Sequence, residues 1–209
     1  MRWVTLLLML CLARPALADC VILLHGLARS EAALIVMESA LEAEGFAVVR
    51  PGYPSTSASV EALAEAVLPH ALERCDTGPV HVVTHSMGGI LLRYWIDRHG
   101  VPDRLGHVVM MGPPNQGSEV VDTLGDLAAF GWLNGPAGAQ LGTGAQGLPR
   151  RLPPVTYPVG VIAGSQSLNP YFSSLLPGPD DGKVSVASTR VAGMTAHLTL
   201  PVTHTFMMN

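Results

Sequence analysis

Hydrophobic positions along the chain fall into short continuous apolar runs and longer stretches in which apolar residues recur at helical spacing. The continuous runs have the length of strands and predict them at 21–24, 46–49, 80–83, 107–111 and 159–163. The stretches with helical spacing predict helices at 31–44, 59–74 and 89–98. Apolar strands that alternate with helices favour an α/β fold, in which a mostly parallel sheet has helices on both faces.

The pattern weakens between residues 118 and 158, where glycine and proline are frequent. Two short apolar runs, 184–186 and 197–200, are candidates for further strands near the end of the chain. There is no internal repeat and no stretch with the composition of a linker between domains. We therefore expect residues 19–209 to form a single domain.

Residues 1–18 have the pattern of a signal peptide. A basic Arg2 precedes an apolar run at 4–12, and Ala16-Leu17-Ala18 fits the small-x-small pattern of a cleavage site. The apolar run is too short to span a bilayer as a mature helix, and a buried first helix is the alternative. We expect cleavage after Ala18 and an exported protein, periplasmic or secreted, with no stable membrane span.

Cysteine usage agrees with an exported protein. Removal of the signal peptide takes away Cys11 and leaves two cysteines, Cys20 and Cys75. An even pair in an oxidising compartment predicts one disulfide, with two buried free thiols as the alternative. Attachment of a lipid to Cys20 is disfavoured, because lipoprotein signals have a small residue before the cysteine and Asp19 stands there.

Composition and charge narrow the class of protein. Of the 209 residues, 48% are hydrophobic and 13% are charged, which excludes a disordered chain and suits one well-buried domain. The formal net charge is −4, and Lys183 is the only lysine. Because no run of basic residues is present, the sequence disfavours nucleic acid and anionic membrane surfaces as electrostatic partners.

A serine stands where a strand is expected to turn into a helix. The segment Thr84-His85-Ser86-Met87-Gly88 lies between the predicted strand 80–83 and the predicted helix 89–98. A serine in such a turn has an exposed hydroxyl at the positive end of a helix, and small residues after it allow close packing. Gly88 and Gly89 meet this need, whereas Thr84 adds bulk where glycine is usual. The alternative is an ordinary serine near a helix N-cap.

Five segments, taken in order along the chain, resemble landmarks of bacterial lipases and esterases of the α/β-hydrolase family. They are Leu24-His25-Gly26-Leu27, Thr84-His85-Ser86-Met87-Gly88-Gly89, Gly112-Pro113-Pro114-Asn115-Gln116-Gly117-Ser118, Asp181-Gly182-Lys183-Val184 and His204-Thr205-Phe206. The resemblance implies a small α/β-hydrolase fold with a minimal cap. It departs from the family pattern near Asn209, because the family has a helix after the histidine of the last segment.

Carried over to these segments, the resemblance implies a catalytic triad of Ser86, Asp181 and His204, in the family's chain order. Ser86 would attack the carbonyl, His204 would move the proton, and Asp181 would orient His204. The backbone N–H groups of Leu27 and Met87 would form the oxyanion hole.

Two of these roles have a rival in the sequence. Asp180 adjoins Asp181, which is preferred because it directly precedes Gly182, as in the family. His197 is a second candidate for the base, but it stands in an apolar run that suits a core or edge position better than a catalytic one. His204 is therefore the preferred base.

Other chemistry is less evident. No pair of His or Cys residues has the spacing of a zinc site, so neither a metal nor a cofactor is predicted, although a calcium site built from scattered carboxylates stays open. His25 and His85 are expected to shape the loops around the site. Phe130 and Trp132, in the glycine-rich stretch, are expected to bind substrate as part of an apolar rim, with plain burial as the alternative.

These observations predict a serine carboxylic-ester hydrolase, either a carboxylesterase or a triacylglycerol lipase, with an acyl-ester or lipid substrate. The same triad would also serve a thioesterase or an acyltransferase of the cell envelope. A non-catalytic binding protein with a degenerate site is the third possibility, and Thr84 is the residue that favours it.

Overall fold

The sheet of this protein is entirely parallel. The computed structural model describes residues 18–76 and 78–208, apart from the side chain of Phe130. Within this part of the chain, six strands pair in the order β2-β1-β3-β4-β5-β6, and every neighbouring pair is parallel. The strands are β1 (Cys20–Leu24), β2 (Ala47–Val49), β3 (Val80–His85), β4 (Leu105–Met111), β5 (Val159–Gly164) and β6 (Ala196–Leu200).

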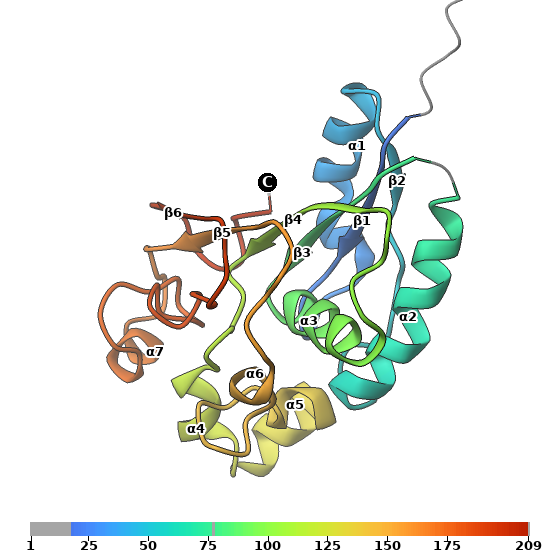
Figure 1. Cartoon of the computed structure of the whole chain (residues 1–209). Helices are drawn as coiled ribbons and strands as arrows, with labels where there is room; N and C mark the ends of the chain where they lie inside the picture. The colour runs from blue at the N-terminus through green and yellow to red at the C-terminus, as the bar shows by residue number, and fades with distance from the viewer. Residues whose placement is uncertain (1–17, 77, 209) are drawn as a thin grey trace, which may run out of the picture.

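Helices cover both faces of this sheet. Figure 1 shows α2 and α3 against one face and α1 against the other, with α4 to α7 gathered at one end of the molecule. A short 3₁₀ turn, η1, leads into α1. The helical segments are η1 (Glu31–Leu34), α1 (Ile35–Ala43), α2 (Val60–Arg74), α3 (Met87–His99), α4 (Glu119–Leu124), α5 (Ala128–Ala139), α6 (Leu148–Arg151) and α7 (Pro170–Leu175).

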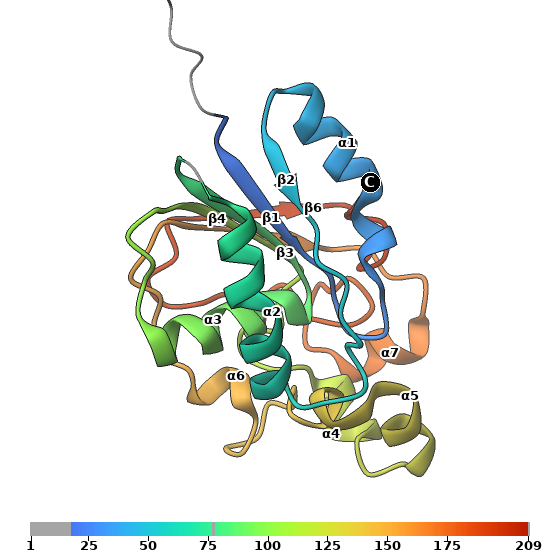
Figure 2. The ribbon, with the colours of Figure 1, turned by 90° about the vertical axis from the view of Figure 1, so that its right-hand side faces the viewer.

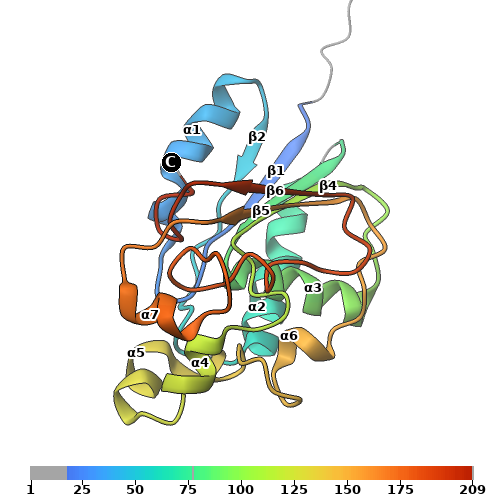
Figure 3. The ribbon, with the colours of Figure 1, turned by 90° about the vertical axis from the view of Figure 1, so that its left-hand side faces the viewer.

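The burial of β1 explains its continuous apolar sequence. Ile22 and Leu24 belong to the core shared with α2 and α3, whereas Val21 and Leu23 belong to a second core on the other face. A strand that is buried on both faces has no polar side, so its sequence does not alternate. Met208 packs into the second core, and Figures 2 and 3 show the end of the chain beside α1.

The predicted α/β fold is confirmed, and most predicted elements lie within one or two residues of the observed ones. The predicted strand at 197–200 is β6, at the edge of the sheet. The predicted strand at 184–186 is wrong. There the backbone closes a turn instead, with Asp181 N–H donating to Val184 O and Val184 N–H donating to Asp181 Oδ1.

The predicted disulfide is also confirmed. Cys20 at the start of β1 and Cys75 after α2 form a disulfide, and both residues are buried. The predicted signal peptide lies outside the described residues, apart from Ala18. Among the helices that the structure describes, none is long and apolar enough to cross a membrane.

Candidate active site

The backbone at Ser86 has a conformation that few side chains adopt. Ser86 joins the end of β3 to α3 with φ 53° and ψ −125°, and positive φ is uncommon for a residue other than glycine. Such strained positions persist only where the surrounding structure enforces them, and they gather at functional sites. The serine therefore lies in the sharp strand-to-helix turn that the sequence predicts.

The small residues around this turn are required by close backbone packing. A Cβ at Gly88 would lie 2.7 Å from Leu24 O and 2.9 Å from His25 O, so helix α3 passes directly behind β1. A Cβ at Gly89 would lie 3.1 Å from Thr84 Oγ1. The missing side chain of Gly89 thus makes room for Thr84, the residue that departs from the family pattern.

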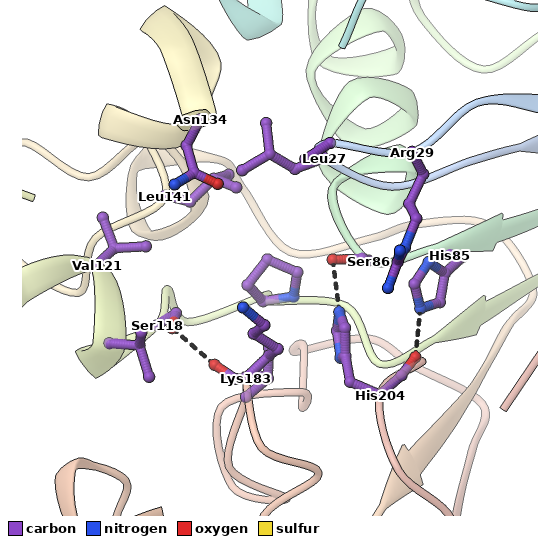
Figure 4. Close-up of a pocket in the computed structure, with 14 residues that line it drawn as sticks. Leu27, Arg29, His85, Ser86, Ser118, Val121, Asn134, Leu141, Lys183 and His204 are labelled. Carbon is purple, nitrogen blue, oxygen red and sulfur yellow. Dashed lines mark hydrogen bonds between the residues drawn. The ribbon is translucent and has the colours of Figure 1, made fainter. Parts of the chain in front are cut away.

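Three predicted residues form one hydrogen-bonded line. Ser86 Oγ lies 2.9 Å from His204 Nε2, and His204 Nδ1 lies 2.7 Å from Asp181 Oδ2 (Figure 4 shows the first of these contacts). The other carboxylate oxygen of Asp181 accepts hydrogen bonds from the backbone N–H groups of Lys183 at 3.0 Å and Val184 at 2.8 Å. These donors fix the carboxylate so that Oδ2 faces the imidazole.

The rival residues lie elsewhere. Asp180 Oδ1 accepts hydrogen bonds from Gly182 N–H at 2.7 Å and from Ser173 Oγ at 3.0 Å, and no contact joins it to His204. His197 lies in β6, with its Nε2 2.9 Å from Thr189 Oγ1. The geometry therefore pairs Ser86 with His204 and Asp181 rather than with either rival.

Two buried imidazoles support the loops around Ser86. His85 Nε2–H donates to the carbonyl oxygen of His204 at 2.8 Å, so the residue before the serine holds the backbone of the facing histidine. Burial holds the pKa of His85 well below the usual range of histidine, and the nearby His204 lowers it further. His25 stacks on Tyr53 at a centroid distance of 3.7 Å, and the Tyr53 hydroxyl donates to the carbonyl of His25.

A pocket of about 260 Å³ opens onto Ser86 and His204. Leu27, a predicted oxyanion-hole residue, lines it. Met87, the other one, is the first residue of α3 and is buried. The N–H groups of the first turn have no acceptor within their own helix, so the Met87 N–H is available to a bound oxygen atom.

The wall opposite Ser86 comes from the glycine-rich stretch, but through residues that sequence reasoning missed. Val120 and Val121 of α4, Asn134 of α5 and Leu141 line the pocket (Figure 4). Trp132 is 85% exposed and does not line it, while the side chain of Phe130 lies outside the described structure. The rim role of these two residues remains a prediction.

Two cationic residues of the pocket were also missed. Arg29 and Lys183 line it together with Ser86 and His204. The only sequence signal was the place of Lys183 beside the Asp181-Gly182 segment. Across the described residues, no group of three or more His, Cys, Asp or Glu side chains is arranged to hold a metal ion.

Comparison with known proteins adds a family model and several solved structures. A model described as alpha/beta hydrolase family matches residues 21–204. The mature form of the Bacillus licheniformis lipase BlEst2 is 20% identical, with a TM-score of 0.69, covering 93% of this chain and 88% of that chain. For the propeptide form the identity is 19% and the TM-score 0.74, covering 92% of this chain and 47% of that chain.

Two further structures have other activities in their names. Phospholipase PlaB from Legionella pneumophila is 19% identical, with a TM-score of 0.58, covering 84% of this chain and 45% of that chain. The RedJ thioesterase of Streptomyces coelicolor is 20% identical, with a TM-score of 0.56, covering 94% of this chain and 84% of that chain. This chain therefore spans about half the length of the propeptide form of the lipase and of the phospholipase. No curated protein sequence matches it.

Proposed function

This chain belongs to the α/β-hydrolase family, and on that premise we propose that it is a serine hydrolase that cleaves carboxylic esters through an acyl-Ser86 intermediate. The observation that carries the proposal is the hydrogen-bonded line from Ser86 through His204 to Asp181 at the wall of a pocket. A fold of this kind hosts many activities, so the argument depends on the site and not on the fold.

The first half of the proposed reaction forms the acyl-enzyme. Ser86 Oγ attacks the ester carbonyl carbon while its proton passes to His204 Nε2, and Asp181 stabilises the imidazolium that results. The negative charge on the carbonyl oxygen is stabilised by the N–H groups of Leu27 and Met87. When the tetrahedral intermediate collapses, the bond to the alcohol oxygen breaks, and His204 returns the proton to that oxygen.

The second half repeats these steps with water. His204 Nε2 accepts a proton as the water oxygen attacks the acyl carbon, and the intermediate collapses to release the carboxylic acid and to reprotonate Ser86. Because Asp181 is buried and its Oδ1 already accepts two backbone N–H groups, Oδ2 stays directed at His204 through both halves. The base therefore needs no reorientation between the steps.

A fluorophosphonate probe, which reacts with an activated serine, tests this proposal. We expect the protein to be labelled once and the Ser86→Ala variant not to be labelled, with unchanged circular dichroism. Ser174→Ala is the matched control, because this exposed serine donates only to the carbonyl of Tyr171. Labelling of Ser86→Ala would exclude Ser86 as the nucleophile.

The same experiment separates the alternatives. Labelling together with turnover of simple esters supports an esterase or lipase, and faster turnover of the matching thioesters would favour a thioesterase. Labelling without hydrolysis would point to an acyltransferase. Absence of labelling would leave a binding protein with an inactive site.

We also propose that residues 1–18 are removed on export and that the mature domain begins at Asp19. The disulfide between Cys20 and Cys75 supports this, because disulfides persist in oxidising compartments. Mass spectrometry of exported protein tests the proposal, since a retained N-terminal segment would contradict it.

A further inference from the structure

The pocket beside Ser86 has an unusual charge balance for a protein with a formal net charge of −4. Its lining includes the guanidinium group of Arg29 and the ammonium group of Lys183, the only lysine of the chain. No Asp or Glu is among the described residues that line it. His85, also in the lining, is neutral because burial holds its pKa well below the usual range. The cavity therefore carries two uncompensated positive charges.

The carboxylates next in sequence to the lining residues have other partners. Asp181 faces His204, and its second oxygen accepts the two backbone N–H groups described above. Glu119 Oε1 accepts a hydrogen bond from Ser188 Oγ at 3.2 Å, and Asp122 accepts one from Thr143 N–H at 2.8 Å. None of these three carboxylates lines the pocket, so none neutralises the two cations there.

Both cations are held near the reacting groups by separate contacts. Arg29 Nη2 donates to Thr205 Oγ1 at 2.9 Å, one residue after His204. The ammonium group of Lys183 lies 4.8 Å from the ring centroid of Phe172. In the view of Figure 4, the two side chains extend to either side of the Ser86–His204 pair.

The two cations also interact with each other. Desolvation of its ammonium group lowers the pKa of Lys183, the positive charge of Arg29 lowers it further, and Asp181 raises it. Like charges that face one cavity repel, and an anion bound between them would remove this repulsion and gain attraction from both. The pocket thus offers an anionic group a stronger interaction than it offers a neutral group of the same shape.

We propose that this pocket selects esters that carry an anionic group, a carboxylate or a phosphate, close to the scissile bond, with Arg29 and Lys183 as the residues that determine this specificity. The inference rests on the proposed function for its reaction but not for its binding preference. Leu27, Val121 and Leu141 supply the apolar wall for the rest of the substrate. Arginine binds a planar oxyanion through two N–H groups, whereas lysine acts as a point charge.

Two matched pairs of esters test the inference and distinguish the position of the anion. The first pair places the charge on the acyl side: 4-nitrophenyl hydrogen succinate against its neutral methyl ester. The second pair places it on the alcohol side: 1-butyrylglycerol 3-phosphate against 1-butyrylglycerol. We expect kcat/KM to be roughly tenfold higher for the anionic member of at least one pair at low salt. The preference should shrink in 0.5 M NaCl, because salt screens partly exposed charges.

Variants assign the preference to residues. In the double variant Arg29→Gln, Lys183→Gln, the ratio of kcat/KM between anionic and neutral esters should fall to about one. The charge-conserving double variant Arg29→Lys, Lys183→Arg should retain most of the ratio. Arg98→Gln is the matched control, because it removes an exposed positive charge from the far end of α3.

Calorimetric titration of the Ser86→Ala protein with the same four esters measures the binding preference without turnover. Equal or weaker binding and turnover of the anionic esters would overturn the inference while leaving an ester hydrolase in place. A preference that survives in the double Gln variant would overturn the assignment to Arg29 and Lys183. If the Ser86→Ala protein prefers the anionic esters but the wild-type protein hydrolyses none of the four, the proposed function fails and the inference about binding stands.

Discussion

At the scale of single residues, the site depends on a buried imidazole one position before Ser86. His85 donates to the backbone carbonyl of His204 and contacts no other part of the hydrogen-bonded line. It therefore acts through the position of the base and does not take part in proton transfer. Misplacement of a reacting group by about 1 Å can lower a rate by roughly a hundredfold, so even a modest movement of His204 should be measurable.

We predict that His85→Ala lowers kcat by about ten- to a hundredfold with little change in KM, since it loosens the base without touching the substrate wall. His85→Gln retains a side-chain N–H donor and should recover much of kcat. Steady-state kinetics of both variants, with melting temperatures to check folding, provides the measurement. Equal losses in the two variants would show that the hydrogen bond to His204 is not what matters.

The glycine after Met87 provides a prediction about stability. A Cβ at Gly88 would come within 2.7 Å of a backbone oxygen of β1, and neither backbone can move freely. Gly88→Ala should therefore lower the free energy of unfolding by about 1–3 kcal/mol and reduce turnover as well. Gly131→Ala is the control, because nothing lies within 4 Å of its Cβ position, and alanine there should be neutral or stabilising. Urea denaturation of both variants measures the difference.

At the scale of elements, the segment from α4 to α6 forms the wall opposite Ser86 in two different ways. Helix α5 is broken at Gly135, where φ is 63° and a Cβ would overlap the carbonyl group of Thr56. The part before the break carries the exposed Trp132, whereas α4 presents Val121 to the pocket. The wall is therefore packed at α4 and open to solvent along the first turns of α5.

This arrangement allows the proposed apolar rim to be tested. We propose that Phe130 and Trp132 contact longer acyl chains, and the exposure of Trp132 means that Trp132→Ala should shift the melting temperature by less than about 2 °C. If the rim binds acyl chains, this variant raises KM for octanoyl esters while acetyl esters are unaffected. A rise in KM with Val121→Ala alone would place the acyl chain against α4 instead.

At the scale of the whole molecule, the two buried histidines make stability depend on pH. Burial lowers the pKa of His25 and of His85 below the ordinary value of 6.5, so both are neutral in the folded protein. Below about pH 6.5 the unfolded chain binds protons that the folded protein does not, so stability falls as the pH decreases, by up to about 1.4 kcal/mol per pH unit for each group.

The resulting prediction is a loss of stability between pH 7 and pH 5 that His85→Gln makes smaller. The variant removes one of the two groups that resist protonation in the folded state, so its urea midpoint should change less over this range. Urea titrations of both proteins at several pH values measure the difference. Parallel curves for the wild type and the variant would contradict the assignment of the pH dependence to His85.

The disulfide also acts on the whole molecule, because it joins β1 to the end of α2 across 55 residues. Closing a loop of this length stabilises the folded state by roughly 4 kcal/mol in the chain-entropy model. The double variant Cys20→Ala, Cys75→Ala should lose most of this amount in urea denaturation. Reductant should weaken the wild type and leave the variant unchanged, and a variant as stable as the oxidised protein would contradict the prediction.

Much of this protein was determined by sequence alone, because the physical causes are local. Apolar runs without alternation predict strands buried on both faces, and β1 is buried in this way between two cores. A serine followed by two glycines predicts the sharp turn at Ser86, since only small residues fit where α3 passes behind β1. The cysteine pair needed no geometry, because only two cysteines follow the expected cleavage site.

Only the tertiary structure decided which neighbours share the site. Asp180 and Asp181 are adjacent, and the backbone hydrogen bonds of their turn direct one carboxylate to His204 and the other to Gly182 and Ser173. The pocket wall at Val121 and Lys183 likewise comes from loops distant in sequence from Ser86. The direction of a side chain in an irregular loop depends on contacts that form only when the chain has folded, and no local pattern records them.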